Sequence, residues 1–237
     1  MEQATAPIES PPAGSEGHRI APPAGEQSPR EELANSLTHG VGLVASIVGL
    51  AVLVGFASRF GNVWHVVSCS VFGATLIFQY ATSTLYHGVW HPPTKRVLRV
   101  LDHCAIFLLI AGTYTPFALV NLRQSWGWLL FAVIWGLALI GIVGRLGSFL
   151  GRERREWLRL ALYLGMGWTA VAAAGPMIRN VGTGGLVLLG LGGLAYTGGV
   201  LFYLRRQMRY HHAVWHGCVL SGSTFHYFAV LFYVVPI

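Results

Sequence analysis

The sequence predicts an all-α integral membrane protein: a bundle of seven transmembrane helices with its N-terminus in the cytoplasm and its C-terminus outside. Of its 237 residues, 54% are hydrophobic and 11% are charged, which is far more apolar than a soluble domain of average composition. Most of its acidic residues fall within the first 32 positions. The rest of the chain contains seven apolar runs close to the roughly 20 residues that a helix needs to cross the hydrocarbon core.

The N-terminal 30 residues are rich in Pro, Gly, Ser, Ala and Glu and have almost no large apolar side chains. Such a segment cannot bury enough surface to fold, so residues 1–30 are expected to form a disordered cytoplasmic tail. They also lack the basic start and apolar centre of a cleavable signal peptide, so we expect the first span to direct insertion. The membrane domain then covers 31–237.

The apolar runs place the spans, and the basic residues between them give the orientation. The tail and the second, fourth and sixth connections hold 13 Lys and Arg residues, against 3 on the other side. Because short basic loops stay in the cytoplasm, the N-terminus is predicted inside. Glycines in the sixth run predict close helix packing. The predicted spans are 37–58, 63–86, 101–122, 126–146, 158–178, 184–204 and 212–236.

Two other classes of protein are disfavoured by the same pattern. The net charge of +7 comes from short clusters between apolar runs and not from a continuous basic stripe, so we expect no nucleic-acid binding. Cys69, Cys104 and Cys218 lie inside apolar runs without CxxC spacing. They are predicted to be small core residues, neither a disulfide framework nor a thiolate metal site.

Three histidines predict a metal site at the cytoplasmic end of the bundle. His212 and His216 are four residues apart, which places both imidazoles on one helix face, one turn apart. His87 ends the second span at the same depth and would leave a fourth position open, as in catalytic zinc sites. Imidazole suits Zn²⁺, whereas calcium and magnesium need more oxygen ligands. The alternative is that each histidine is an interfacial residue reaching the headgroups.

Asp102 and Ser83 are the candidate catalytic residues beside this site. Asp102, the only aspartate, begins the third span at the same depth, where a carboxylate is costly unless it is paired or solvated. It could hold a zinc-bound water or accept its proton; the alternative is a salt bridge to Arg99. Ser83 lies one turn before His87 and could hydrogen-bond the same water; the alternative is bonding to its own helix backbone.

Histidines outside this site have other predicted roles. His39 could support the metal ligands from behind or line the substrate entrance. The alternative is that it belongs to a capping cluster at the start of the first helix. His226 lies about 15 Å beyond His216, too deep for the same metal, and is predicted to be buried and hydrogen-bonded. His211 is predicted to be interfacial. No specific partner is expected for His65, His91 and His103.

The segments EELANSLTHG, STLYHGVWH, LDHCAIFLLIAGTYTPF and HAVWHGCVLSGSTFHYFAV resemble signature blocks of the bacterial hemolysin III proteins, relatives of the progestin and adiponectin receptors. The resemblance implies a seven-helix fold with a cytoplasmic N-terminus and zinc near the cytoplasmic face. It places the ligands at His87, His212 and His216, with Ser83 and Asp102 next to the zinc-bound water. Departures from the blocks are small: Gly217 and Cys218 replace bulkier residues, and Tyr227 replaces Phe.

The superfamily includes alkaline ceramidases, and its bacterial members are associated with haemolysis and with control of membrane fluidity. We therefore expect a multi-pass protein of the bacterial inner membrane whose partners are membrane lipids. The first hypothesis is a zinc-dependent hydrolase of a lipid amide or ester bond. The second is a non-enzymatic regulator of fluidity, or a receptor-like sensor, with structural zinc. A lytic toxin is least favoured, because the apolar spans would anchor the protein in its producer.

Overall fold

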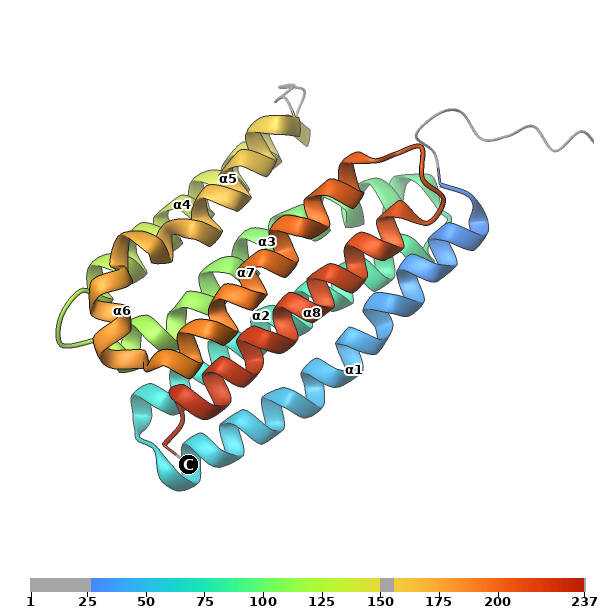
Figure 1. Cartoon of the computed structure of the whole chain (residues 1–237). Helices are drawn as coiled ribbons and strands as arrows, with labels where there is room; N and C mark the ends of the chain where they lie inside the picture. Colours follow the sequence, from blue (N-terminus) through green and yellow to red (C-terminus); the bar gives the residue numbers. More distant parts are fainter. Residues whose placement is uncertain (1–26, 150–155, 237) are drawn as a thin grey trace, which may run out of the picture.

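The computed structural model describes residues 27–149 and 156–236 (Figure 1). The disorder predicted for the N-terminal tail falls mainly on residues 1–26, outside these ranges. The first helix begins at Pro29, two residues before the predicted domain boundary. Its start is fixed locally, because Ser28 and Glu31 form a capping box and proline occupies the first helical position.

The first half of the chain forms four long helices. Helices α1 and α3 begin well before the apolar runs that predicted them, at Pro29 instead of 37 and at Pro92 instead of 101. Hydropathy marks only the part of a helix that crosses lipid, so these polar first turns carried no apolar signal. The elements are α1 (Pro29–Phe60), α2 (Val63–Gly88), α3 (Pro92–Pro116) with a π-helical turn (Phe117–Asn121), and α4 (Gly127–Phe149).

The second half contains an interruption that the sequence did not predict. The span expected over 158–178 is α5 (Glu156–Trp168), a 3₁₀ segment (Thr169–Ala173) and α6 (Ala174–Val181). The Tyr114 hydroxyl lies 2.7 Å from Gly167 O and accepts a 2.8 Å bond from Ala170 N. This side chain therefore satisfies backbone groups that the break releases. Helices α7 (Thr183–Leu204) and α8 (His211–Tyr233) complete the chain.

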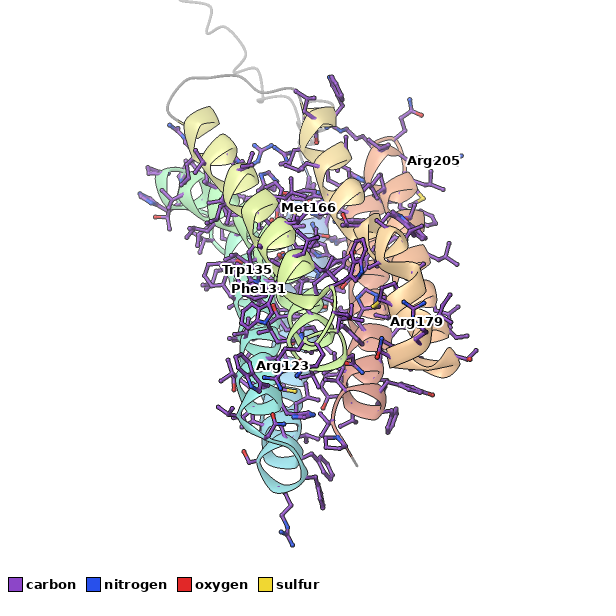
Figure 2. All side chains as sticks on the ribbon, turned by 90° about the vertical axis from the view of Figure 1, so that its left-hand side faces the viewer. Arg123, Phe131, Trp135, Met166, Arg179 and Arg205 are labelled. Atoms are coloured by element: carbon purple, nitrogen blue, oxygen red, sulfur yellow. The ribbon has the colours of Figure 1, made fainter. Side chains whose placement is uncertain are left out.

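The described helices make this a multi-pass membrane protein and confirm the predicted seven-helix bundle. Six segments are long and apolar enough to span a membrane. The seventh, α8, has 23 residues, or about 35 Å, but is more polar because it carries four histidines. The start of α1 and the C-terminus lie at opposite ends (Figure 1), and Arg205 lies at the opposite end from Arg123 and Arg179 (Figure 2). Which end faces the cytoplasm stays a prediction.

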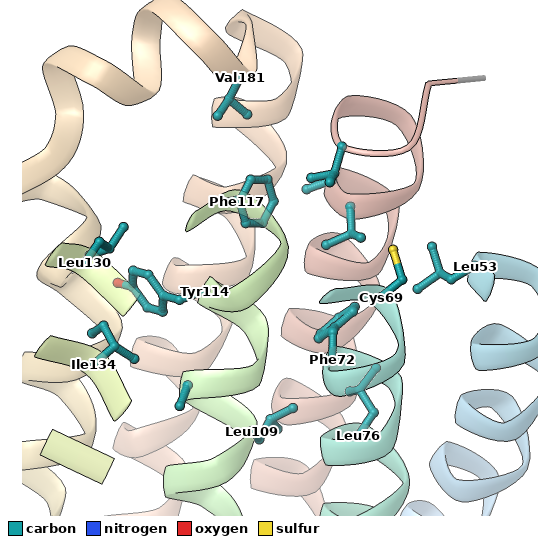
Figure 3. Close-up of a cluster of buried hydrophobic side chains, with 14 of the residues drawn as sticks. Leu53, Cys69, Phe72, Leu76, Leu109, Tyr114, Phe117, Leu130, Ile134 and Val181 are labelled. Carbon is teal, nitrogen blue, oxygen red and sulfur yellow. The ribbon is translucent and has the colours of Figure 1, made fainter. Parts of the chain in front are cut away.

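Helices α2 and α3 form the inside of the bundle. Within their spanning windows 56% and 72% of residues are buried, against 17–28% for the other four windows. Helix α8 lies between α1 and α7, with α4 and α5 on the far side of the bundle (Figure 1). An apolar core that includes Leu53, Phe72, Leu109 and Ile134 fills the middle of the bundle and the end near the C-terminus (Figure 3).

Glycines allow the helices to approach closely, as the sixth apolar run predicted. Gly185, Gly192 and Gly199 recur every seven residues along the face of α7 that meets α8. A Cβ on Gly199 would lie 2.7 Å from the side chains of Trp215 and Cys218, closer than packed atoms tolerate. The three cysteines are free, and Cys69 and Cys104 are buried, in keeping with the prediction of small core residues.

Candidate metal centre

The structure brings the three predicted metal ligands together. His87 ends α2, and His212 and His216 lie in the first two turns of α8. Nitrogen atoms of the three rings lie within 4.8 Å of one another. The ring centroids of His212 and His216 are 4.6 Å apart, and each lies 5.0 Å from that of His87. These helices therefore supply a three-histidine set from positions far apart in the chain.

The hydrogen bonds of two of these rings fit a bound metal ion. His87 Nδ1 lies 2.6 Å from the Glu32 carboxylate, and His216 Nδ1 lies 3.2 Å from the Asn35 carbonyl oxygen. Because both partners accept, each ring carries its proton on Nδ1 and has its lone pair on Nε2. In the described ranges the buried Nε2 of His87 has no hydrogen-bond partner, which is the state that a ligand nitrogen needs.

Glu32 is a member of the site that the sequence analysis missed. Its side chain is 10% exposed, and its second oxygen lies 3.0 Å from Lys95 Nζ. Lys95 also donates to the backbone oxygen of Tyr86, one residue before His87. Glu32 thus has a partner for each oxygen and holds the His87 ring. The same argument from depth that selected His87 and Asp102 could have found it, since it starts the first helix at that end.

Asp102 and Ser83 lie side by side in the wall of a cavity next to the ligands. Asp102 is buried and accepts a 3.2 Å bond from Gln79 Nε2. Across residues 27–149 and 156–236 it makes no ion pair, so the alternative salt bridge to Arg99 is not found. Ser83 Oγ is buried and has no hydrogen bond of normal geometry within those ranges, so the backbone-bonding alternative is not found either. Such a hydroxyl calls for a water or ligand partner.

His39 lies directly behind His216, one of the three clustered histidines. Its ring stacks on that of His216, with centroids 3.5 Å apart and planes at 11°, and meets Tyr80 edge-on at 5.0 Å. It lies ten residues after Pro29, in the interior of α1, so the capping interpretation is wrong. Its place behind His216 and in the cavity wall agrees with the interpretation that His39 supports the site from behind or lines its entrance. The stacking also limits the orientations of the His216 ring.

The other histidines require one correction. His103 Nδ1 accepts a 3.0 Å bond from Arg145 Nε, His91 Nδ1 lies 2.9 Å from Thr94 Oγ1, and His65 completes the cap of α2 with Asn62. The prediction that these three lack specific partners is therefore wrong, because neighbouring turns supply polar groups that spacing alone does not show. His226 Nε2 lies 3.2 Å from Leu189 O, which confirms the predicted hydrogen bond, and the residue is half-buried.

The cavity runs from the ligands into the bundle between α3, α5, α7 and α8. Its volume is about 140 Å³, an order of magnitude more than the roughly 10–15 Å³ that one water needs. Gln79, Ser83, Asp102, His212 and His216 line one end, and Tyr196 and His226 line the other. The wall between them is apolar and includes Ile106, Leu109, Ile110, Leu164, Val200 and Val219.

Comparison with known proteins agrees with the motif blocks. Residues 27–227 match the family described as haemolysin-III related. The chain belongs to this family. Similar relatives are the hemolysin-3 homolog of Bacillus subtilis (strain 168), 42% identical over 88% of this chain and 96% of the relative, and hemolysin-3 of Bacillus cereus, 42% identical over 87% and 93%. The human monocyte to macrophage differentiation factor is 32% identical over 92% of this chain and 90% of its own length. The resemblance to the hemolysin III proteins that the motif blocks indicated is thus confirmed over most of the chain.

Proposed function

We propose that this haemolysin III-related protein is a zinc-dependent hydrolase that cleaves an amide or ester bond of a membrane lipid. The observation that carries the proposal is the cavity itself. Its wall combines two of the three clustered histidines with Asp102 and Ser83, and then continues as an apolar channel. A set of nitrogen ligands, a carboxylate and a hydroxyl at the head of an apolar cavity suits a polar head joined to an acyl chain.

The residues support this chemistry in separate roles. Three histidines leave a coordination position open, and zinc bound there would lower the pKa of a bound water to about 7 and polarise a carbonyl. In this proposal Asp102 accepts the proton of the attacking water and returns it to the leaving amine or alcohol, which balances the hydrolysis. The Gln79 bond fixes one carboxylate oxygen and leaves the other for this proton. The Ser83 hydroxyl can orient the lipid carbonyl or the water.

A second candidate function is a regulator or sensor of membrane state with structural zinc. The placement of the ligands favours it, because His87 lies on α2, His212 and His216 lie on α8, and Glu32 adds α1 through His87. A metal ion there would join three helices. On this hypothesis the ion stabilises one arrangement of the bundle and Asp102 has no chemical role.

The deciding experiment compares wild type with Asp102→Asn, purified in lipid and loaded with zinc. Metal content and hydrolysis of ceramide and acyl-ester lipids are measured in parallel, with substrates chosen from a lipidomic comparison of cells with and without the protein. We expect equal zinc content and a fall in turnover of about 10²–10⁴-fold, the usual contribution of a general base. Stoichiometric zinc without cleavage of any lipid, and a cellular effect that survives Asp102→Asn, would contradict the hydrolase and favour the sensor.

A further inference from the structure

One face of α8 runs from the metal centre to the far end of the cavity. His212, His216, Val219, Ser223 and His226 follow alternating spacings of four and three, which places them on a single side of the helix. All except Ser223 line the cavity. His226 lies ten residues after His216, or about 15 Å along the helix. A ligand that starts at the metal centre can therefore extend to the polar groups at the other end.

Most polar groups at that far end have already used their hydrogen-bonding capacity within the protein. The Tyr114 hydroxyl bonds to the backbone of α5 and the following 3₁₀ segment. Trp168 Nε1 donates to Thr197 Oγ1 at 3.1 Å, and that hydroxyl donates to Gly193 O at 2.7 Å. These side chains join helices and leave no free proton for a ligand.

Tyr196 is different, because a chain of hydroxyl groups leaves its proton free. Tyr80 donates to Ser223 Oγ at 2.8 Å, and Ser223 Oγ lies 2.8 Å from the Tyr196 hydroxyl. The geometry allows either oxygen of this second pair to donate. With Tyr80 donating to Ser223, donation from Ser223 to Tyr196 is the arrangement in which both protons have an acceptor. The Tyr196 hydroxyl then keeps its own proton to donate elsewhere, and its side chain lines the cavity.

His226 supplies the complementary acceptor. Its Nε2 lies 3.2 Å from Leu189 O, and a carbonyl oxygen only accepts, so the ring proton is on Nε2 and Nδ1 keeps a lone pair. The ring centroids of Tyr196 and His226 are 5.5 Å apart. Both are seated on glycines: Gly192 lies against the His226 ring and Gly222 against the Tyr196 ring. A side chain at either glycine would displace the pair.

We infer that Tyr196 and His226 form a subsite for a hydroxyl group on the acyl chain of the lipid. One free donor beside one free acceptor complements a neutral alcohol, which accepts one bond and donates another. The wall before the subsite is apolar, so a chain hydroxyl held there without such partners would lose the hydrogen bonds that it makes in water. The inference rests on the proposed function in one respect, that the carbonyl end of the lipid lies at the metal centre.

The distance between the two sites gives the position of this hydroxyl on the chain. An extended polypeptide advances roughly 3.5 Å per residue, and each residue contributes three backbone bonds. An extended acyl chain therefore advances about 1.2 Å per bond. The separation of about 15 Å along α8 then corresponds to roughly a dozen bonds. The structure thus favours acyl chains hydroxylated near the twelfth carbon over unsubstituted chains and over chains hydroxylated beside the carboxyl group.

The test is a binding comparison on the zinc-loaded protein in lipid nanodiscs. Three probes are titrated: stearate, stearate with a hydroxyl on its twelfth carbon, and stearate with a hydroxyl on its second carbon. We expect the twelfth-carbon acid to bind about five- to tenfold more tightly than stearate, the effect of one additional buried hydrogen-bonded group. Tyr196→Phe, which keeps the ring against Gly222, should remove this preference and leave stearate binding unchanged. The second-carbon acid should show no dependence on Tyr196.

The matched control is Tyr203→Phe, on the same helix and in the same cavity wall, because the Tyr203 hydroxyl already donates to Glu156. This variant should keep the preference. Equal binding of stearate and the twelfth-carbon acid to wild type would overturn the inference. So would a loss of stearate affinity in Tyr196→Phe as large as the loss for the hydroxylated acid, since the tyrosine would then act through cavity shape. Binding needs no turnover, so a hydroxyl preference without hydrolysis keeps the subsite and contradicts only the hydrolase.

Discussion

The contact between Glu32 and His87 decides how one ring of the three-histidine cluster is oriented. The carboxylate fixes the Nδ1 proton of His87 and so directs Nε2 toward the other two ligands. Lys95 holds the second carboxylate oxygen, so Glu32 is itself positioned. Carboxylate–histidine–metal arrangements of this kind raise the basicity of the ligand and fix its ring. Glu32 is therefore a positioning residue, which would act on a bound metal through His87.

Removal of this carboxylate should weaken zinc binding. We expect Glu32→Ala to lower zinc affinity by about 10–100-fold, the usual effect of losing such a partner, and Glu32→Gln to fall between wild type and Glu32→Ala because it keeps an acceptor oxygen. Competition against a zinc-binding dye measures both. Glu31→Gln is the matched control: its side chain bonds to Ser28 and to Tyr210 N but not to His87. Equal loss in Glu31→Gln and Glu32→Gln would show that the effect comes from the fold of α1.

At this scale the sequence predicted which histidines cluster better than it predicted the surroundings of that cluster. Spacing and depth were enough to select His87, His212 and His216, because these depend only on helix period and on position along the membrane normal. The partners Glu32, Gln79 and His39 could not be assigned in the same way. Their roles depend on how each helix is rotated about its axis and on side-chain rotamers, which are set by packing between helices.

The interface between α7 and α8 depends on glycines at intervals of seven residues. Gly192 is the one nearest the hydroxyl subsite, where a Cβ would collide with the His226 ring. In lipid the hydrophobic effect does not drive helices together, so their association depends on close van der Waals packing. A small residue at this position therefore fixes both the distance between the helices and the place of the histidine.

Enlargement of this position should be costly. Gly192→Ala is expected to destabilise the protein by about 1–3 kcal/mol through overpacking, measured by thermal unfolding in detergent. Gly190→Ala on the same helix is the control, because no atom beyond the neighbouring residues lies within 4 Å of its added Cβ. Alanine has the better helix propensity, so this variant should be neutral or slightly more stable. Equal stability of the two variants would show that α7 and α8 are less tightly packed than the structure indicates.

Apolar run length predicted the existence and order of the helices, and irregular turns within them were missed. The 3₁₀ segment Thr169–Ala173 and the π-helical turn Phe117–Asn121 give no signal in hydropathy. In the first, the Ala170 N–H donates to the Tyr114 hydroxyl of another helix. The second follows Pro116 in α3, and a proline ring disfavours a regular helix. Contacts between helices and local backbone chemistry decide such features, so a count of apolar residues cannot find them.

The whole molecule has an apolar core at one end and a polar end with the three-histidine cluster at the other. Leu53, Phe72 and their neighbours pack the first, whereas the buried polar residues Glu32, Asn35, His87 and His216 gather at the second. Buried polar groups contribute little to stability unless they are fully partnered. A metal ion would provide the missing partner for His87 and cross-link α2 to α8.

Zinc should therefore stabilise the entire bundle. At free zinc about 100-fold above its dissociation constant, mass action adds about 2.7 kcal/mol to the free energy of unfolding, or a rise in Tm of about 5–10 °C for a chain of this length. Thermal unfolding with zinc and with a chelator measures the difference. His212→Ala should lose this rise, while His211→Ala, which changes the neighbouring histidine outside the triad, should keep it. An equal Tm of the wild type with zinc and with the chelator would contradict the proposed metal centre. A rise that persists in His212→Ala would place the ion elsewhere, because two histidines on separate helices cannot retain the affinity of three.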